Sequence, residues 1–315
     1  MAHNINDLYT DVLYKLRGAP IEETRNGVVK TVQSPVCYTM NSPLERVLFC
    51  PQRKANPYFH IMEAVWMFAG EDDISFLLPF NSRMAEFAEP DGKVHGAYGH
   101  RWRNHFSMDQ IGSVITVLQE NHETRQAVIA MWDPNELDMS PHWKDRPCNT
   151  HLYFRVVGGK LDMTVCNRSN DVVWGMCGAN IVHMTYLQEL IATAIKIPVG
   201  RYHVMSNNIH IYQHHWHYLG RPMSLDYYEQ ADVNPYPLLG GMESDWWEFL
   251  QECKIFVANG PDWAYSSKWL TEVVSPMYEH YTCRLNGDTM TYDTSETKAT
   301  DWRLAEDHWR EQHDN

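Results

Sequence analysis

Basic residues are scarce in this sequence of 315 residues: 26 lysines and arginines stand against 40 aspartates and glutamates, and the formal net charge is −14. Nucleic-acid backbones attract clustered Lys and Arg, so this deficit argues against a nucleic acid as partner. A local basic pocket for one small anion is still compatible with it. The sequence also lacks an apolar run as long as a membrane span, so no membrane partner is expected.

Cysteine occurs seven times, but never as a CxxC pair. An odd count without such pairs argues against a disulfide framework and against a zinc site. The histidine-rich stretch HIYQHHWH has no Cys or acidic ligand nearby, so no metal is predicted there either. The chain start, MAHNINDLYTDVLY, lacks the basic and then apolar layout of a signal peptide. Together these absences predict a cytoplasmic protein.

The spacing of apolar residues predicts an α+β fold, in which helices flank a mixed sheet within a single domain. No repeat, low-complexity tract or linker interrupts the chain before about residue 235. The predicted helices are residues 60–70, 108–120 and 180–196, and the chain from about residue 294 is predicted to form an exposed or partner-packed helix. The predicted strands are residues 127–133, 201–208 and 209–215, with a hairpin over residues 151–169 that turns at Gly158 and Gly159.

Cys148 is a candidate nucleophile. It lies in DRPCNTH, after a proline and at the start of a predicted strand, with Arg146 two residues away. A thiol reacts well only as the thiolate, and a nearby cation lowers its pKa from about 8.5. Taken alone, a cysteine at a strand start is more often a small buried hydrophobe. The local pattern leaves both interpretations open.

Glu63 interrupts the otherwise apolar segment IMEAVWMF. A buried carboxylate without a partner costs several kcal/mol, so Glu63 must have a partner, be protonated or reach a cavity. One interpretation is a structural ion pair. The other is an acid–base group with a raised pKa.

Three arginines lie at the ends of predicted elements. Arg25 precedes an Asn-Gly turn, Arg125 opens the strand RQAVIAMW, and Arg168 ends the strand TVCNRS. Each taken singly is a surface charge. Together they could form a phosphate clamp, because guanidinium binds phosphate through two parallel hydrogen bonds, and Ser169 could add a hydroxyl donor.

His210 and Tyr212 alternate in IHIY and therefore face the same side of a predicted strand. They could hydrogen-bond a sugar hydroxyl. The tryptophan-rich stretch DWWEF, residues 245–249, is interpreted as core or interface.

Several of these segments together resemble the thymidylate synthase family, which includes the pyrimidine hydroxymethylases of phages and antibiotic pathways. The resemblance covers roughly residues 20–220, and its motifs occur in the family's order, which makes it more specific than any single motif. The segments that carry it are TRNG, HIMEAVWMFAG, HGAYGHRW, TRQAVIAMWDP, RPCNTHLYFRV, CNRSNDVVWG and NNIHIY.

The resemblance implies roles for three residues in the chemistry. Cys148 would attack C6 of a pyrimidine ring, Glu63 would order water and relay protons, and Tyr98 would be the site tyrosine. Addition of a thiolate at C6 makes C5 nucleophilic, so that C5 can attack the one-carbon unit of 5,10-methylenetetrahydrofolate. Loss of the folate then leaves an exocyclic methylene. Hydride delivery converts it to a methyl group, and addition of water converts it to a hydroxymethyl group.

The resemblance also implies residues that bind a pyrimidine nucleoside monophosphate. Gln126 stands where the family usually has a second arginine, which makes the phosphate clamp one charge weaker. The implied ligands are Arg25, Arg168 and Ser169 for the phosphate, with Arg125 lent across a homodimer interface, Asp171 for the site floor near the folate, and His210 and Tyr212 for the sugar hydroxyls.

Two departures from the synthases favour water over hydride. Met84 and Phe87 stand where synthases have two tryptophans that pack on the folate and shield the methylene, and a less shielded intermediate is easier for water to reach. The synthases end in a short apolar tail that closes the site, whereas this chain ends with a charged, helix-like segment.

A third departure concerns the residue that reads the base. An ungapped count from Gly175 places Ala179 where synthases have Asn and deoxycytidylate hydroxymethylases have Asp. A small residue there resembles the cytidylate hydroxymethylases of antibiotic pathways. A one-residue bulge in GMCGAN would instead bring Asn180 into the pocket, and uracil would then be the expected base.

The ungapped count is favoured, and the sequence therefore predicts a homodimeric enzyme that hydroxymethylates C5 of CMP or dCMP with methylenetetrahydrofolate. The alternatives within the family are thymidylate synthase and deoxyuridylate hydroxymethylase, and the alternative outside it is a catalytically silent nucleotide-binding homologue. Residues 1–235 are predicted to form the catalytic domain. Residues 236–315 are predicted to be an extension packed on it or at the dimer interface.

Overall fold

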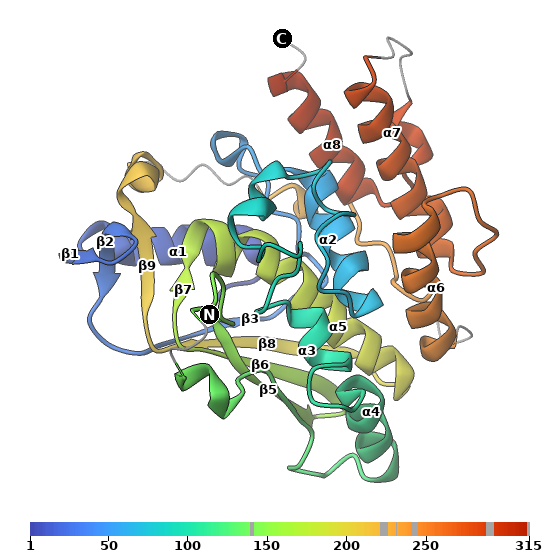
Figure 1. The fold of residues 1–315 in the computed structure, drawn as a ribbon, viewed down its shortest axis with the longest axis horizontal. Coiled ribbons are helices and arrows are strands. Elements are labelled where there is room, and N and C mark those ends of the chain that lie inside the picture. Colours follow the sequence, from blue (N-terminus) through green and yellow to red (C-terminus); the bar gives the residue numbers. More distant parts are fainter. Residues whose placement is uncertain (139–141, 221–225, 231, 241–244, 288–292, 314–315) are drawn as a thin grey trace.

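A computed structural model of the chain describes residues 1–138, 142–220, 226–230, 232–240, 245–287 and 293–313. The α+β architecture is confirmed, with helices that flank two sheets (Figure 1). The helices are α1 (Ile5–Arg17), α2 (Pro57–Ala69), α3 (Tyr98–Arg103), α4 (Gln110–Glu120), α5 (Asn180–Ala194), α6 (Trp246–Asn259), α7 (Ser275–Leu285) and α8 (Thr300–His313). The strands are β1 (Ile21–Thr24), β2 (Gly27–Val32), β3 (Val36–Met40), β4 (Val128–Ala130), β5 (Asn149–Val157), β6 (Lys160–Asn167), β7 (Asn170–Asp171), β8 (Val199–Ser206) and β9 (Ile209–Tyr212).

The larger sheet has the strand order β3-β8-β6-β5-β4 and is mixed, because β6 runs parallel to β8 while the other neighbours are antiparallel. The predicted β5–β6 hairpin is confirmed, and Val157 pairs with Lys160 across the turn. Gly158 and Gly159 have φ angles of 58° and 75°, which glycine adopts without strain.

The smaller sheet has the order β1-β2-β9-β7 and brings together segments that are distant in the sequence. β9 lies between β2, to which it is antiparallel, and the short strand β7, to which it is parallel. Asp171 is paired with His210 in this register. The predicted single sheet is therefore two sheets, because the chain between residues 167 and 170 leaves β6 and starts to pair with β9.

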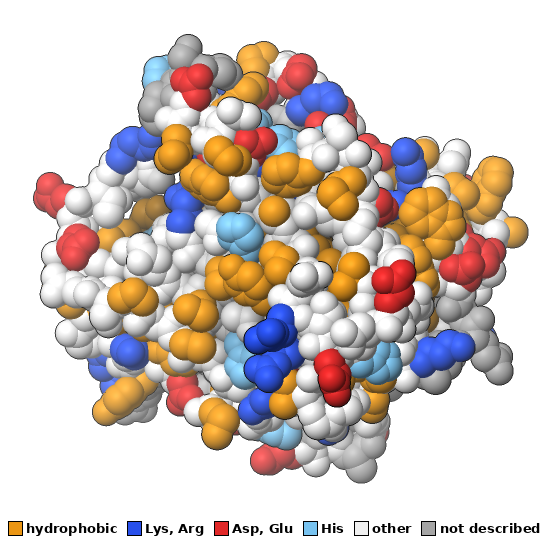
Figure 2. All heavy atoms as spheres, turned by 90° about the horizontal axis from the view of Figure 1, so that it is seen from below, with side chains coloured by type: hydrophobic (Ala, Val, Ile, Leu, Met, Phe, Trp, Pro, Cys, Tyr) orange, Lys and Arg blue, Asp and Glu red, His pale blue; other side chains and the backbone are white. Residues whose placement is uncertain are grey.

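The outer face of the larger sheet is turned away from α5 and carries partly exposed side chains. Tyr153 is 43% exposed and Met205 is 47% exposed. The His151 and Tyr153 rings stack on this face with their centroids 6.0 Å apart. Figure 2 shows the molecule from this side, with hydrophobic side chains gathered across the middle of the view among histidines and basic residues.

Helices α2 and α5 form the centre of the molecule and pack against each other. Asn56 caps the start of α2, Pro57 occupies its first turn, and the helix ends at Gly70, whose φ of 77° stops it. All residues of α2 except His60 are buried. A helix that is apolar on nearly every side has no face for solvent and must be enclosed by other elements.

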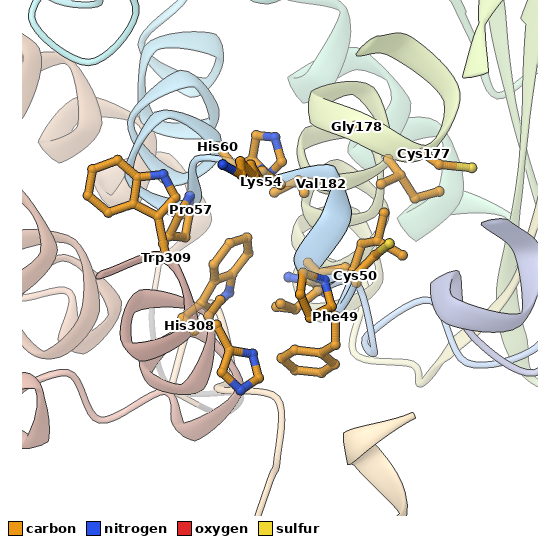
Figure 3. A pocket seen from close by; sticks show the side chains of 18 of the residues that line it. Phe49, Cys50, Lys54, Pro57, His60, Cys177, Gly178, Val182, His308 and Trp309 are labelled. Carbon is orange, nitrogen blue, oxygen red and sulfur yellow. The ribbon is translucent and has the colours of Figure 1, made fainter. Parts of the chain in front are cut away.

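The C-terminal helices α6, α7 and α8 supply part of that enclosure by packing on α2 (Figure 1). Polar contacts reinforce this packing: the Tyr228 hydroxyl donates to the Asp301 carboxylate at 2.9 Å, and Trp302 Nε1 donates to the Tyr186 hydroxyl at 2.9 Å. A pocket lies between α8, the segment 46–57 and the start of α5, and Figure 3 shows Trp309 on one side of it and Gly178 on another.

Two predicted strands differ in length from the observed ones. β4 covers only residues 128–130, and the segment predicted as a strand over 209–215 ends at Tyr212. Tyr212 pairs with Val29, near the start of β2, so the chain beyond it has little partner strand left. Residues 213–219 form a 3₁₀ helix instead, and Trp216 Nε1 donates to the Ile211 carbonyl at 3.2 Å. Among the described residues, no helix is long and apolar enough to cross a membrane.

Asp301 provides a test of how the C-terminal helices are held. Burial raises the pKa of Asp301 from 3.8 to about 7. A carboxyl with a higher pKa in the folded chain binds its proton more tightly there, so its contribution to stability is lost as pH rises from about 4 to about 7. Asp301→Asn should therefore gain stability relative to the unsubstituted chain across this range, by on the order of 2 kcal/mol.

Urea denaturation at pH 4.5 and pH 7.5 would measure the free energy of unfolding of both chains. Asp11→Asn, on the exposed side of α1, is the control and should show no such dependence. A difference between Asp301→Asn and the unsubstituted chain that stays constant with pH would contradict the assignment.

Candidate active site

A pocket opens beside α2, where the segment before β5 and the segment after β6 come together. Six of the residues predicted for the site lie in its wall: Glu63, Tyr98, Cys148, Ser169, Asp171 and Asn180. The other lining residues are Trp66, Met67, Met84, Phe87, Val94, Gly96, Ala97, Asp145, Asn170, Trp174 and Gly175.

Cys148 directly precedes β5 and is half-buried. Burial raises the pKa of its thiol, and the Asp145 and Asp171 carboxyls add to this effect, while the Arg168 guanidinium opposes it. A buried thiol is mostly protonated at neutral pH, so its nucleophilic form depends on the nearby cation. Of the residues that influence this pKa, Arg168 is the one that favours the thiolate.

Arg168 lies just after β6 and holds the cysteine segment in place. Its Nε donates to the Pro147 carbonyl at 2.9 Å and its guanidinium to the Arg146 carbonyl at 3.0 Å, while its backbone N–H donates to the Cys148 carbonyl at 2.9 Å. The side chain is still exposed, and its guanidinium lies 5.5 Å from the centre of the Trp132 ring. An exposed cation with a fixed orientation beside the thiol can bind a small anion.

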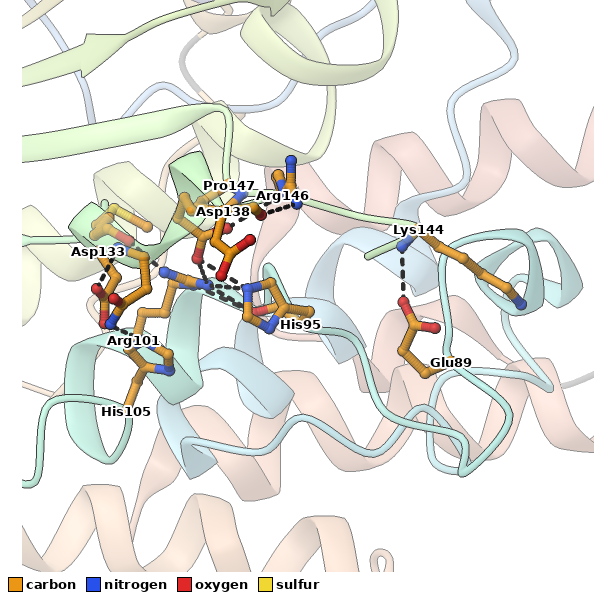
Figure 4. Close-up of polar contacts among 12 residues, drawn as sticks. Glu89, His95, Arg101, His105, Asp133, Asp138, Lys144, Arg146 and Pro147 are labelled. Atoms are coloured by element: carbon orange, nitrogen blue, oxygen red, sulfur yellow. Dashed lines mark hydrogen bonds and ion pairs between the residues drawn. The ribbon is translucent and has the colours of Figure 1, made fainter. Parts of the chain in front are cut away.

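A buried polar network lies beside the segment of residues 145–148, which carries Cys148 (Figure 4). Arg101 is fully buried, donates to the Met131 carbonyl at 2.8 Å and pairs with the Glu136 carboxylate. It also donates to the His95 carbonyl at 3.0 Å. The loop before α3 packs so closely on the cysteine segment that a Cβ at Gly96 would lie 2.1 Å from Asp145. These contacts fix the relative positions of the two segments that carry Tyr98 and Cys148.

Tyr98 and Glu63 are brought together by the packing of α3 on α2. The helices approach so closely that a Cβ at Gly99 would lie 2.1 Å from the Met67 carbonyl, and only glycine leaves room. Met67 is one turn after Glu63 on α2. Tyr98 begins α3, and burial raises the pKa of its hydroxyl well above the usual value, with the charges of Cys148 and Asp145 adding to the effect. Tyr98 is therefore a neutral hydroxyl at the pocket wall.

Asp171 lies at the other side of the pocket. Its carboxylate accepts hydrogen bonds from the N–H groups of Val173 at 2.8 Å and Trp174 at 3.5 Å and thereby caps the following segment. Burial nevertheless raises its pKa. His210, its partner in the sheet register, has a pKa lowered by burial, so the imidazole is neutral. The His210 and Tyr212 rings meet edge to face at 5.1 Å.

The helix that follows Asp171 is broken where the base-reading residue is expected. The π-helical segment η4 (Val172–Ala179) has non-helical angles at Cys177 and Gly178, and α5 begins only at Asn180. A Cβ at Gly178 would lie 2.6 Å from the Val173 carbonyl, so this close turn requires glycine.

The break at Gly178 separates the π-helical segment from α5 directly before the two candidate base-reading residues. Asn180 lines the pocket, and Ala179 is 6% exposed within the hydrophobic core. Of the two candidates for the base-reading position, Asn180 lines the pocket and Ala179 does not, and which of them contacts the base stays a prediction.

The predicted phosphate ligands Arg25, Arg125 and Arg168 are absent from the pocket lining, as are the predicted sugar ligands His210 and Tyr212. Arg25 is exposed in the turn between β1 and β2, where its Nε lies 3.4 Å from Asn26 Oδ1. Arg125 is exposed in the segment before β4, the edge strand of the larger sheet. Their roles in phosphate binding stay predictions, as do the roles of the residues that the pocket brings together.

Sequence reasoning missed several residues of the site. Trp174 lines the pocket and stacks on Phe59, with ring centroids 6.0 Å apart and planes at 30°. Its position three residues after Asp171 was the available signal. Asp145 lines the pocket three residues before Cys148. His183 lies 3.6 Å from Glu63, and its place one turn after Asn180 could have indicated this neighbourhood.

The fold and the pocket define an α+β enzyme whose site combines a buried thiol, a carboxylate and an oriented guanidinium. Residues 7–234 match the protein family described as thymidylate synthase, and the chain belongs to this family. It is accordingly a one-carbon transferase that modifies C5 of a pyrimidine nucleotide.

Three phage proteins named deoxyuridylate hydroxymethyltransferase are similar to it. The protein of Pseudomonas phage M6 is 35% identical over 327 residues, which cover 98% of this chain and 92% of that protein. The protein of Bacillus phage SP01 is 33% identical over 216 residues, covering 65% and 56% respectively. The protein of Delftia phage PhiW-14 is 31% identical over 203 residues, covering 61% and 56%.

The effect of Arg168 on Cys148 can be measured as thiol reactivity. Because the thiolate is the reactive form, alkylation of Cys148 by iodoacetamide should rise with pH and reach its midpoint above the range of an ordinary cysteine. Arg168→Ala removes the cation that opposes the rise in pKa, so the midpoint should move to still higher pH and the rate at pH 8 should fall several-fold. Peptide mass spectrometry would follow the rate at Cys148.

Arg168→Lys keeps a charge at this position and is the matched control. An unchanged midpoint in Arg168→Ala would show that the guanidinium does not act on the thiol.

Proposed function

We propose that the protein hydroxymethylates C5 of deoxyuridine monophosphate, with methylenetetrahydrofolate as the one-carbon donor. The observation that carries the proposal is the break at Gly178, because it puts Asn180 rather than Ala179 in the pocket wall. The names of the three phage relatives, which specify deoxyuridylate, support the same base. The cytidylate predicted from the sequence rested on Ala179 and is replaced by this proposal.

The Asn180 side chain suits a uracil edge. Uracil presents the N3–H donor beside the O4 acceptor, and an amide offers one acceptor and one donor to match them. A site that hydrogen-bonds one base edge rejects a base with the opposite pattern, because buried polar groups would then be left unpaired. Ala179 has no polar group and could not make this distinction.

The remaining lining residues fit the donor and the expected fate of the one-carbon unit. Trp174 and Phe87 offer flat apolar surface beside the Asp171 carboxyl, which suits a folate ring system with hydrogen-bond donors at its edge. Methylenetetrahydrofolate, when bound, supplies the one-carbon unit. Met84 and Phe87 line the wall where synthases shield the methylene with tryptophans, which favours water as the group that completes the reaction.

The residue roles in this proposal are those that the family resemblance implies. Cys148 adds to C6, Glu63 directs water, and the Tyr98 hydroxyl stays protonated as a hydrogen-bond donor. The phosphate is bound by Arg168, which is exposed and oriented beside the thiol, with Ser169 next to it. His210 and Tyr212 hydrogen-bond the sugar.

A homodimer would complete the phosphate site. The outer face of the larger sheet carries partly exposed apolar side chains such as Tyr153 and Met205, which suits association with a second copy (Figure 2). Arg125 is exposed at the edge of that sheet and is absent from the wall of its own pocket. We therefore propose that Arg125 is lent to the partner's site.

A product assay tests the proposal. The enzyme is incubated with methylenetetrahydrofolate and, separately, with dUMP, dCMP and CMP, and the nucleotides are analysed by mass spectrometry. We expect hydroxymethyl-dUMP together with tetrahydrofolate. Methyl-dUMP with dihydrofolate would identify a thymidylate synthase, and product from a cytidine nucleotide alone would overturn the uracil assignment. Cys148→Ala should lose turnover by at least about 10⁴-fold while it still binds dUMP, because covalent catalysis is removed but the phosphate ligands are kept.

Base selection can be tested separately at Asn180. Asn180→Asp offers only acceptors when ionised, so it should lower kcat/KM for dUMP by about 100-fold or more, as expected for a mismatched buried polar group. It should also raise activity towards dCMP, whose amino group is a donor. Ala179→Ser is the matched control and should leave the preference for dUMP unchanged. A change of preference in the control but not in Asn180→Asp would restore Ala179 as the base-facing residue.

A further inference from the structure

A second amide side chain, Asn170, lies beside Asn180 in the pocket wall. Asn170 belongs to β7 and is 3% exposed, whereas Asn180 is the first residue of α5. The two side chains meet at Gly175, which also lines the pocket. A Cβ added to Gly175 would lie 3.0 Å from Oδ1 of Asn170 and 3.3 Å from Nδ2 of Asn180. Both polar atoms therefore border the same space, which a glycine at position 175 leaves open.

Asn170 is held in one orientation by its other hydrogen bonds. Its backbone N–H donates to the Asn208 carbonyl at 2.8 Å, and its Nδ2 donates to the Ser206 hydroxyl at 3.1 Å. Its Oδ1 borders the space beside Gly175 and has no hydrogen-bond partner within the described part of the chain. Buried polar atoms are normally paired, so this oxygen is an acceptor that favours a donor at its side.

The Asn180 side chain can supply that donor in only one of its two orientations. An amide keeps its shape when its oxygen and nitrogen are exchanged, so the hydrogen bonds around it decide which end lies where. With Nδ2 on the side of Asn170, as in the structure, an amide N–H of Asn180 is available to the Asn170 oxygen. The exchanged orientation would put two oxygens beside each other and leave a buried acceptor unpaired, which is unfavourable.

This choice of orientation matters because an unrestrained amide fits both pyrimidines. Uracil presents a donor at N3 and an acceptor at O4, whereas cytosine presents an acceptor at N3 and a donor at N4. An asparagine matches uracil in one orientation and cytosine in the other. Asn180 alone therefore does not select a base, and selection requires a neighbour that fixes its amide.

We propose that Asn170 is a positioning residue that determines base specificity, because its Oδ1 holds the Asn180 amide in the orientation that matches uracil. This inference rests on the proposed reading of dUMP by Asn180. One N–H of Asn180 donates to Asn170 and the other to O4 of the base, while Oδ1 of Asn180 accepts from N3–H. Ser206 completes the arrangement by accepting from the other end of the Asn170 amide.

Internal competition between dUMP and dCMP measures the preference. Both nucleotides are added at equal concentration with methylenetetrahydrofolate, and mass spectrometry gives the ratio of the two C5-modified products at low conversion. This ratio equals the ratio of the two kcat/KM values and does not depend on the amount of folded enzyme. Asn170→Leu keeps a similar size but removes the oxygen. We expect the ratio of uracil to cytosine product to be at least about tenfold lower, since the freed amide can turn to match cytosine.

Two further variants test the contact in other ways. Asn170→Asp keeps an oxygen beside Asn180, and the Ser206 hydroxyl can turn to donate to its second oxygen, so the product ratio should stay within about threefold of the unsubstituted enzyme. Gly175→Ala changes neither amide, but its methyl group enters the space that both polar atoms border. It should also lower the ratio, and it decides the question if Asn170→Leu does not fold.

Asn167 offers a matched control outside the pocket wall. It is also a buried asparagine, at 5% exposure, and its Nδ2 donates to Oδ1 of Asn149. Asn167→Leu should lower the melting temperature without changing the product ratio. In an Asn180→Ala background, Asn170→Leu should leave the ratio unchanged, because a residue that acts through Asn180 has no effect once that amide is removed.

The outcomes separate this inference from the proposed function. If the unsubstituted enzyme makes no hydroxymethyl-dUMP, the proposed function fails before any variant is compared. If it prefers dUMP, and the ratio is unchanged in Asn170→Leu, Asn170 is only structural and the inference is wrong. An equal fall in Asn170→Asp and Asn170→Leu would also overturn it, as would an effect of Asn170→Leu that persists in the Asn180→Ala background.

Discussion

The contact between α2 and α5 is the constraint on which the rest of the structure depends. Both helices are buried along almost their whole length, so every other element is placed by the need to enclose them. The sheets cover one side and the C-terminal helices cover another. Glu63 and Asn180 project from these two helices into one pocket, and their separation is set by helix packing rather than by flexible loops.

The C-terminal helices are part of this constraint. α6 makes the most extensive contact with α2 of any of them, and α8 covers the back of the break at Gly178 through the pocket in Figure 3. The family match ends at residue 234, so these helices follow the matched region in the sequence. Trp302 and Trp309 on α8 bury apolar surface where this helix packs on the rest of the chain.

Much of the fold and about half of the site could be predicted because the signals were local. Apolar periodicity located the central helices, and the two glycines located the β5–β6 hairpin. An irregularity in GMCGAN was one of two alternatives that the sequence left open, and the choice between them could not be made because no local pattern reveals the close approach of Gly178 to the Val173 carbonyl. Beyond the break, Asn180 rather than Ala179 lines the pocket. His183 was missed because its partner, Glu63, lies on a different helix.

The charge of the site explains how an acidic protein can bind a nucleotide. Burial raises the pKa values of Cys148, Asp145 and Asp171, which disfavours negative charge on groups near Arg168. The exposed guanidinium therefore keeps its attraction for a small anion although the whole chain carries a formal net charge of −14. A long polyanion would be repelled by the negative charge of the whole protein surface, whereas a small monophosphate is affected mainly by the charges close to Arg168.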